Sequence, residues 1–353
     1  MGKKIVMITS GWKMSGVYRV ESELIDEWRR QGHNVSILNA NGRIMSDALQ
    51  KMTVEELEEE PSVKIIAIVH RFIRLRQFFK HHREDTIVAL SITADIFAAL
   101  FGLTLKNKIV ISERNDPGQY PKSKLYSKFR DLCFELADVC VFQTCDAMKH
   151  FSKRVQRRGV IIPNPINGKI PEYPLDRNTE KTVMSTGRLK EQKNFPMLIK
   201  AFAKFNEQYP EYTLELYGDG PLKDELLQLS SELGIQERVL FNDFCDDIFP
   251  IMARTSMFVM SSNYEGISNS MLEALAIGIP TICTDCPVGG AREMIENGVN
   301  GLLVPVGDVD ALSKAMCRIA GDDEFARRWA KNAHEIRVKY PAEAIASRWT
   351  DIM

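Results

Sequence analysis

A chain of 353 residues is long enough for two domains, each with its own hydrophobic core. Its 44% hydrophobic and 26% charged residues are ordinary for a globular protein, and a net charge of -1 gives no overall field that favours nucleic acid. The seven cysteines include no Cys-x-x-Cys pair, so we expect reduced core residues and no metal centre. Met1 is followed almost directly by an apolar strand, which predicts a cytoplasmic protein without a secretory leader.

Strand-like and helix-like segments alternate through the first half of the chain, a pattern typical of parallel α/β sheets. The predicted helices of this half include 18–31 and 122–136. Its predicted strands, short runs rich in Ile and Val, are 4–9, 34–38, 63–68, 86–90, 108–112 and 139–143.

Two segments of this half bear on membranes. Segment 70–83 is basic and also carries the apolar residues Phe72, Ile73, Leu75, Phe78 and Phe79. It predicts either a helix packed in its own domain with a solvated basic face or a helix that lies on an anionic bilayer. The apolar run 87–105 is long enough to span a membrane, but a charged Asp95 at mid-bilayer would cost about 2.5–3.5 kcal/mol on insertion scales. We therefore expect a strand, a polar turn and a helix at 94–102.

The second half repeats the alternation after a stretch rich in Pro, Asn and Gly at 163–174, which predicts the interdomain linker. Helical segments split at Tyr340-Pro341 end the chain. We expect two Rossmann-like domains, 1–165 and 166–340, followed by a last helix in 341–353. The predicted strands of the second half are 182–185, 213–217, 239–242, 257–261, 281–284 and 301–304.

The motif richest in chemistry begins at Glu265 and ends at Glu273, about one turn inside a predicted helix. Ser268, Asn269 and Ser270 are good cap residues for that helix, and a helix start favours a phosphate through its unpaired N–H groups and its dipole. Two acids beside such a site suit a nucleotide sugar, which carries hydroxyl groups at both ends. The alternative is that Glu273 only complements the helix dipole, worth about 0.3–1 kcal/mol, while Glu265 is a surface acid.

This stretch resembles the Glu-x7-Glu motif of retaining glycosyltransferases, most closely glycosyltransferase family 4. Further stretches that match the family in its order are 185–194, 216–221, 288–293 and 300–305. The resemblance is dense from about Thr182 onwards and sparser before it. It implies the GT-B fold, in which two Rossmann-like domains face each other across a cleft. It also implies that 1–165 is the acceptor side, 166–340 binds the nucleotide sugar, and the C-terminal helix crosses back to the first domain.

The resemblance assigns roles to three catalytic residues. Arg188 and Lys193 would hold the departing diphosphate, whose negative charge grows as the glycosidic bond breaks. Glu265 would lie beneath the donor sugar near its anomeric centre, and Glu273 would bind the ribose hydroxyl groups. The donor-binding residues implied in the same way are Gly16, Gly187, Gly266, Ser268, Asn269, Ser270, Met271 and Glu273.

The first domain departs from the family pattern at two loops. Many relatives have paired glycines where this chain has Ser15-Gly16, so the diphosphate role is carried to Gly16 alone. Many relatives have His where this chain has Arg114, next to Glu113. Arg114 is expected to contact the sugar or an acceptor phosphate, with Glu113 as an acid/base. The alternative is a Glu113–Arg114 ion pair that braces the end of a strand.

Neither a metal nor another cofactor is expected. The family needs none, because its cations are Arg and Lys. Asp308-Val-Asp310 has the spacing of metal-dependent transferases, but it reads as a helix cap followed by a first-turn acid. Gly218-Asp-Gly220 is only half of a dinucleotide fingerprint.

The resemblance therefore implies a metal-independent, retaining glycosyltransferase that moves a hexose or N-acetylhexosamine from a UDP-sugar to a glycan acceptor. It places the enzyme in polysaccharide or glycoconjugate biosynthesis, with a lipid-linked acceptor and a peripheral position at the inner face of the cell membrane. No residue stands out as a covalent nucleophile, and the family is described by front-face substitution. The alternatives are a nucleotide-sugar 2-epimerase, which shares the fold, and a non-catalytic nucleotide-sugar-binding protein.

Overall fold

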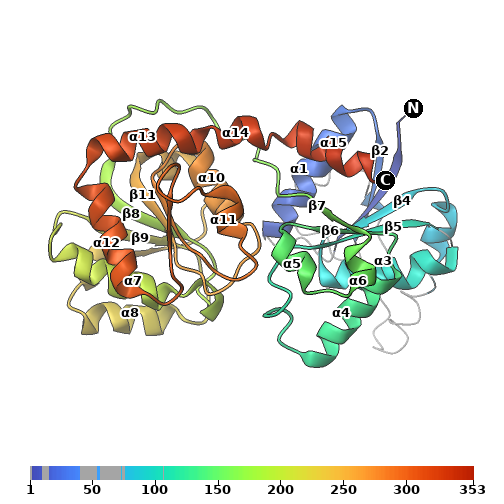
Figure 1. The fold of residues 1–353 in the computed structure, drawn as a ribbon, viewed down its shortest axis with the longest axis horizontal. Coiled ribbons are helices and arrows are strands. Elements are labelled where there is room, and N and C mark those ends of the chain that lie inside the picture. Colours follow the sequence, from blue (N-terminus) through green and yellow to red (C-terminus); the bar gives the residue numbers. More distant parts are fainter. Residues whose placement is uncertain (1, 10–15, 40–53, 56–72, 74–75, 106) are drawn as a thin grey trace. The chain divides into compact units, whose positions relative to one another are not determined.

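The computed structural model describes residues 2–9, 16–39, 54–55, 73, 76–105 and 107–353. The chain divides into two compact units (Figure 1). Unit 1 comprises Met1–Pro165 and Ala342–Met353, and unit 2 comprises Ile166–Pro341. The predicted strand at 63–68, Ser15 and residues 70–72, 74 and 75 lie outside the described residues.

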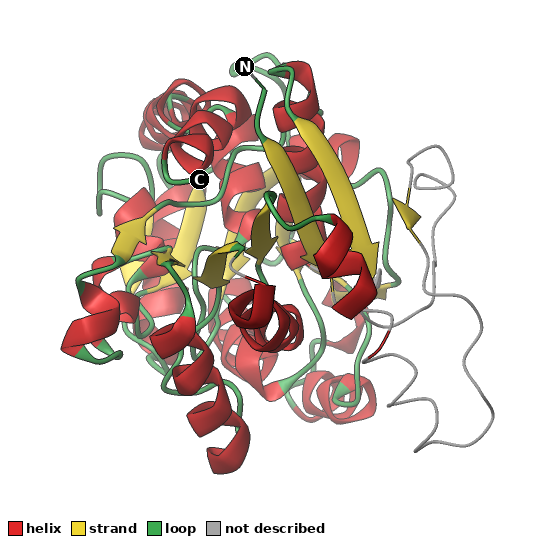
Figure 2. Ribbon diagram, turned by 90° about the vertical axis from the view of Figure 1, so that its right-hand side faces the viewer, coloured by secondary structure: helices red, strands yellow, loops and turns green. Residues whose placement is uncertain are grey.

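Unit 1 contains a parallel sheet of seven strands in the order β3-β2-β1-β4-β5-β6-β7. The strands are β1 (Lys4–Thr9), β2 (Asn34–Asn39), β3 (Val54–Glu55), β4 (Thr86–Ala89), β5 (Lys108–Glu113), β6 (Val139–Phe142) and β7 (Gly159–Ile161). The helices are α1 (Gly16–Arg30), α3 (Ile92–Leu105), α4 (Lys124–Leu136), α5 (Cys145–Lys149) and α6 (Lys153–Gln156). Figure 2 shows the strands in yellow and the helices around them in red.

The central strands of unit 1 are buried on both faces, which explains their continuous apolar sequence. Residues Ile5 to Ile8 of β1 are all 0% exposed. The last helix, α15 (Ala342–Asp351), completes this unit by packing against α1. Trp28 donates from its indole N–H to the carbonyl of Ala346 at 3.1 Å, and its ring meets that of Trp349 edge-on at 6.3 Å. The expectation that the final helix returns to the first domain is confirmed.

Unit 2 contains a parallel sheet of six strands in the order β10-β9-β8-β11-β12-β13. The strands are β8 (Glu180–Thr186), β9 (Thr213–Tyr217), β10 (Val239–Asn242), β11 (Thr255–Met260), β12 (Thr281–Thr284) and β13 (Leu302–Val304). The helices are α7 (Phe195–Asn206), α8 (Lys223–Glu232), α9 (Phe249–Arg254), α10 (Asn269–Ile277), α11 (Gly290–Met294), α12 (Val309–Ala320), α13 (Asp323–His334) and α14 (Ile336–Lys339).

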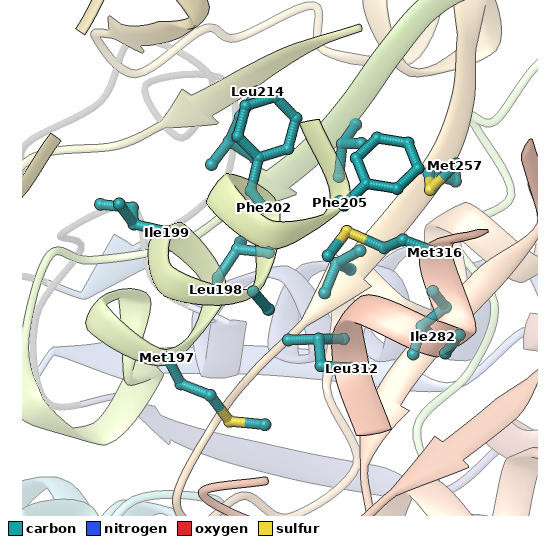
Figure 3. Close-up of a cluster of buried hydrophobic side chains, with 14 of the residues drawn as sticks. Met197, Leu198, Ile199, Phe202, Phe205, Leu214, Met257, Ile282, Leu312 and Met316 are labelled. Carbon is teal, nitrogen blue, oxygen red and sulfur yellow. The ribbon is translucent and has the colours of Figure 1, made fainter. Parts of the chain in front are cut away.

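Alternate residues of the unit 2 strands supply two separate cores, because successive side chains of a strand point to opposite faces. Val183 of β8 joins the core formed with α7, α8 and α12. Figure 3 shows the part of this core that α7 and α12 contribute. The next residue, Met184, joins the core formed with α9, α10 and α11. The sheet is therefore covered on both sides, and its ligand-binding potential lies at the ends of the strands.

The predicted element positions agree closely with those of the structure. Strands 4–9, 213–217, 239–242 and 281–284 have the bounds that the sequence indicated, whereas β3 and β7 were not predicted. The apolar run 87–105 divides into β4 and α3, and α3 begins two residues before the expected helix. Among the described residues, no helix is long and apolar enough to cross a membrane. All seven cysteines are free, although Cys145 is exposed rather than in a core.

Candidate active site

The strand order of unit 2 places the candidate site. The first strand, β8, lies in the middle of the sheet next to the fourth, β11, so the chain winds outward in opposite directions from this pair. In open α/β sheets ligands bind outside the carboxyl ends of the strands at such a switch point. Gly187 and Arg188 directly follow β8, and the loop that ends at Glu265 follows β11. The two predicted motifs thus emerge side by side.

Hydrogen bonds join the loop after β8 to the loop after β11. Ser261 donates from its hydroxyl group to the carbonyl of Lys193 at 2.9 Å. The amide of Asn263 donates to the carbonyl of Gln192 at 2.8 Å, and the Gln192 side chain donates to the carbonyl of Tyr264 at 3.1 Å. Together with the bonds of the Asn263 side chain to Asn194 and to the carbonyl of Glu191, these three bonds hold Lys193 and Glu265 in a defined mutual position.

The centre of this arrangement is an ion pair. Lys193 Nζ lies 2.7 Å from Glu265 Oε1, and the two side chains are only 18% and 12% exposed. Ser262 donates from its hydroxyl group to the same carboxylate oxygen at 3.2 Å. Arg188, by contrast, is exposed at the end of β8. The site therefore offers an ordered cation beside a carboxylate and a second, accessible cation.

Two cysteines near this ion pair are unsuited to nucleophilic chemistry. Cys283 and Cys286 are both 0% exposed. Burial raises the pKa of Cys286 to about 12, and the Glu265 carboxylate raises it further. Burial likewise raises the pKa of Cys283. Because the thiolate is the nucleophilic form, both side chains remain unreactive thiols.

Two glycines let the backbone of one loop pass against another. A Cβ atom on Gly218 would lie 2.1 Å from the carbonyl oxygen of Gly187, and φ at Gly218 is +144°. A Cβ atom on Gly290 would lie 1.9 Å from the carbonyl oxygen of Gly266, next to Glu265. These glycines thus support the loops that carry Arg188 and Glu265. The close approach of the Gly187 carbonyl therefore explains the glycine at position 218, and this glycine is no evidence for a dinucleotide site.

The helix after Glu265 begins as predicted but is capped differently. Ser268 is the N-cap of α10 with an extended backbone, yet its side chain makes no capping hydrogen bond. The expected capping by the Ser268 hydroxyl is therefore wrong, and this hydroxyl does not occupy the first N–H groups of the helix. Glu273 lies one turn inside α10 and is 3% exposed, so it is not a solvated helix acid. Gly266, Ser268 and Met271 are buried, whereas Asn269 and Ser270 are half-buried.

Asp308 and Asp310 have structural partners. Asp308 is the N-cap of α12, and its carboxylate accepts from the amide of Ala311 at 2.9 Å. Asp310 lies 2.5 Å from Lys204 Nζ. The predicted helix-cap interpretation is confirmed. Over the described ranges, the structure has no group of three or more His, Cys, Asp or Glu that could hold a metal ion.

Unit 1 carries Glu113 and Arg114, the two predicted residues at the carboxyl end of β5. Glu113 ends β5, is 4% exposed, and lies 3.5 Å from Arg130 Nη1. Burial raises the pKa of Glu113 to about 7, against the lowering effect of Arg130. Arg114 donates to the carbonyl of Ile162 at 3.2 Å, and its guanidinium lies 5.2 Å from the Trp349 ring centroid. Glu113 thus forms a salt bridge with Arg130, a partner that the sequence did not indicate, and not the alternative ion pair with Arg114.

Comparison with known proteins decides the family. The family model described as glycosyl transferases group 1 matches residues 169–336. A lipopolysaccharide core biosynthesis glycosyltransferase, LpsE of Rhizobium meliloti, is 36% identical over 243 residues, which are 67% of this chain and 68% of that protein. The chain belongs to the group 1 glycosyltransferases.

Two further relatives show how far the similarity extends. An uncharacterized glycosyltransferase of Methanocaldococcus jannaschii is 30% identical over 255 residues, and the matched stretch spans 62% of its length. A Campylobacter jejuni N-acetylgalactosaminyltransferase, whose name gives a diphospho-undecaprenol-linked glycan as its substrate, is 26% identical over 82% of this chain and 80% of its own.

Among solved structures, Anabaena Alr3699/HepE in complex with UDP and glucose superimposes with a TM-score of 0.85. The match covers 99% of this chain and 98% of that one at 20% identity, which shows the fold. The two parallel Rossmann-like sheets are those of GT-B glycosyltransferases. The predicted fold class is confirmed.

Other residues of this glycosyltransferase gain importance only from the structure. Glu21 of α1 and Asp95 of α3 are 2% and 1% exposed. Burial raises the pKa of Glu21 to about 8 and also raises the pKa of Asp95. Their helices follow β1 and β4, the switch-point strands of unit 1. Sequence analysis used Asp95 only to exclude a membrane span. Gly16 begins α1 and is exposed.

The described part of the basic segment 70–83 favours the packed-helix alternative. Phe78 and Phe79 are 8% and 0% exposed, and the Phe78 ring stacks on His82 at 4.2 Å. Two aromatic rings buried in their own unit are not available to lipid. Ile73, at 49% exposed, is the apolar side chain of this part that faces solvent.

Proposed function

We propose that this glycosyltransferase transfers a sugar from a UDP-sugar to a glycan acceptor with retention of the anomeric configuration. The observation that supports the proposal best is the ordered Lys193–Glu265 pair at the switch point of unit 2, with Arg188 exposed beside it. Unit 2 is then the donor-binding side and unit 1 the acceptor side.

The chemistry follows from the charges. As the bond between sugar and diphosphate breaks, negative charge grows on the leaving group, and fixed cations lower the barrier. Arg188 presents a planar fork to phosphate oxygens, and Lys193 a point charge. Glu265, held by Lys193 and Ser262, binds the hydroxyl groups of the donor sugar. Glu273 binds the ribose, and the backbone amides of Gly266 and 268–271 take the remaining oxygens. The amide of Gly187 donates to the carbonyl of Tyr217 at 2.9 Å, so this residue contributes its lack of a side chain beside Lys193.

The donor and acceptor classes come from the relatives. The HepE crystals contained UDP and glucose, which supports a UDP-hexose or UDP-N-acetylhexosamine as donor. The C. jejuni and R. meliloti proteins are named for lipid-linked glycan and lipopolysaccharide assembly, which supports a lipid-linked acceptor. The relatives described above are transferases, so a 2-epimerase is the less favoured alternative. Incubation with UDP-N-acetylglucosamine without acceptor tests it, since an epimerase would form the epimer.

Metal independence and retention belong to the same proposal. Arg188 and Lys193 supply the positive charge that a divalent cation supplies elsewhere, so turnover should persist in EDTA. Front-face substitution needs no covalent nucleophile, and the departing phosphate takes the acceptor proton. An NMR spectrum of the product that shows the inverted anomer would contradict this mechanism.

Glu113 and Arg114 receive a bracing role in this proposal. Glu113 is enclosed with Arg130, which also donates to the carbonyls of Pro117 and Tyr120 at 2.9 and 2.8 Å. Arg114 faces Ile162 and Trp349 of its own unit. Both residues therefore support the loop after β5, and we do not place them on the donor.

The test compares the alanine variants of two basic site residues with the alanine variant of a third basic residue from the same loop. Arg188→Ala and Lys193→Ala should each lower kcat by about 10²–10³, the usual cost of removing one charge-stabilising group. Lys190→Ala is the control, because Lys190 is an exposed lysine of the same loop and has no assigned role. Unchanged turnover in the first two variants, or an equal loss in all three, would refute the proposed role of the pair.

A further inference from the structure

Helix α4 of unit 1 has an apolar face that stays exposed among the residues that the structure describes. Leu125 is 72% exposed, Leu132 is 51% exposed and Phe129 is 45% exposed. Their spacing of four and three residues places them on one side of the helix, one above the other. Three large apolar side chains in one exposed row differ from the single exposed leucines that are common on surfaces.

The opposite face of α4 explains how the helix is held. Cys133 and Phe134 are 2% and 0% exposed, and Arg130 is 0% exposed within its hydrogen bonds to the 117–120 loop. The helix packs against α3 and α6 on this side (Figure 1). Since α4 is already anchored by its inner face, its outer apolar row is not needed for folding of the unit.

The segment that contains α4 carries a positive net charge, although one of its cations, Arg130, is buried. Residues 121–158 contain nine Lys or Arg and four Asp or Glu, a net charge of +5 in a chain whose total is -1. Three of the four acids are paired with cations of the same segment. Asp131 lies 2.8 Å from Arg130, Glu135 lies 3.6 Å from Arg154, and Asp146 lies 2.8 Å from Lys149.

The lysines of α4 itself add to this positive surface. Lys124 and Lys128 are exposed, and neither makes an ion pair with any residue that the structure describes. Their neighbour Tyr126 is 37% exposed. An apolar row with an aromatic ring and flanking lysines is the pattern of helices that lie in the interface of an anionic bilayer.

We propose that the outer face of α4 docks this glycosyltransferase on an anionic lipid bilayer. Leu125, Phe129 and Leu132 enter the boundary between headgroups and acyl chains, while Lys124 and Lys128 meet lipid phosphates. The proposal replaces segment 70–83 as the docking element, because Phe78 and Phe79 of that segment are buried. It does not rest on the donor chemistry and would stand if the enzyme used another nucleotide sugar.

The test is co-sedimentation of the full chain with vesicles of phosphatidylcholine alone or mixed with phosphatidylglycerol. The chain should bind the mixed vesicles more strongly, and added salt should weaken binding. Leu125→Ser/Phe129→Ser and Lys124→Glu/Lys128→Glu should each lower the partition coefficient by about tenfold or more. Leu227→Ser is the matched control, because Leu227 is a 46% exposed leucine on α8 of unit 2.

A second measurement guards against misfolded variants. Phe129→Trp should gain quenching by brominated lipids relative to the unsubstituted chain, whereas Leu227→Trp should not. Equal binding to both vesicle types, or wild-type binding by Leu125→Ser/Phe129→Ser, would overturn the proposal. It would also be overturned if sedimentation velocity showed a dimer that this variant makes monomeric, because a second copy would then cover the face.

Discussion

Buried acids in unit 1 make its stability depend on pH. Burial raises the pKa of Glu21 from 4.5 to about 8, although a hydrogen bond with Thr9 and the charge of Arg114 lower it. Between those two pH values the folded state holds a proton that the unfolded state has lost. The unfolded state therefore binds fewer protons, and the free energy of unfolding falls as pH rises through this window.

Replacement of Glu21 by glutamine should remove this dependence. Glu21→Gln should match the wild type well below pH 4.5, where the glutamate is neutral in both states, and be more stable above about pH 8. The gain is on the order of a few kcal/mol at most. Urea unfolding at pH values below, within and above the window measures it. Glu343→Gln, at an exposed position of α15, is the control. Parallel curves for wild type and Glu21→Gln would contradict the prediction.

Glu273 and Ser268 show how far a single residue could be predicted. The sequence placed Glu273 one turn inside a helix, and it lies there. Its burial was not predictable, because it depends on α10 packing beneath the sheet. For Ser268 the residue type indicates a side-chain cap, yet its hydroxyl makes no such bond. Residue propensity describes the average N-cap and does not determine whether a particular hydroxyl group makes the capping bond.

Among the elements, α15 shows how the end of the chain stabilises its beginning. Trp349 is 0% exposed between the Trp28 ring and the Arg114 guanidinium, and Lys3 Nζ donates to the carbonyl of Met353 at 2.6 Å. The sequence indicated the helix from its break at Tyr340-Pro341. Its partner could not be derived from local pattern, because residues 28 and 349 are far apart along the chain.

Truncation of the central ring should destabilise unit 1. Trp349→Ala leaves a cavity between α15 and α1, and we expect a loss of about 3–5 kcal/mol in the free energy of unfolding. Denaturant titration followed by circular dichroism measures it. Val338→Ala on α14 is the control, because Val338 is 85% exposed and should change stability by less than about 0.5 kcal/mol. A Trp349→Ala protein as stable as this control would show that α15 does not support unit 1.

Strand prediction succeeded or failed for local reasons. Thr213–Tyr217 has an alternating apolar pattern that ends at Gly218, and its bounds were predicted. Gly159–Ile161 is a three-residue edge strand whose side chains are only half-buried, and it follows the basic stretch 153–158. Such a strand has little hydrophobic signal. Whether this segment joins the sheet depends on its pairing with β6 and not on its own sequence.

For the whole molecule, ligand binding should stabilise unit 2 in particular. UDP at about a hundredfold excess over its Kd should add about 2.7 kcal/mol to the unfolding free energy of the unit that binds it. Differential scanning fluorimetry with UDP, GDP and ADP would rank the bases. Arg188→Ala should lose most of the shift, whereas Lys190→Ala should keep it. A shift that is equal for all three nucleotides would argue against a UDP-specific donor site.

The sequence by itself determined the two alternating halves, the parallel sheets, and the motifs that resemble group 1 glycosyltransferases. These features can be predicted because the period of hydrophobic residues, the turn residues and the order of the motifs are all written directly in the sequence. Tertiary structure alone decided that Lys193 meets Glu265, that Glu113 meets Arg130, and that the outer face of α4 stays exposed. Each of these depends on which strands lie side by side and which helix face is covered. Contacts between residues distant in the chain are set by the packing of whole elements, which no local pattern records.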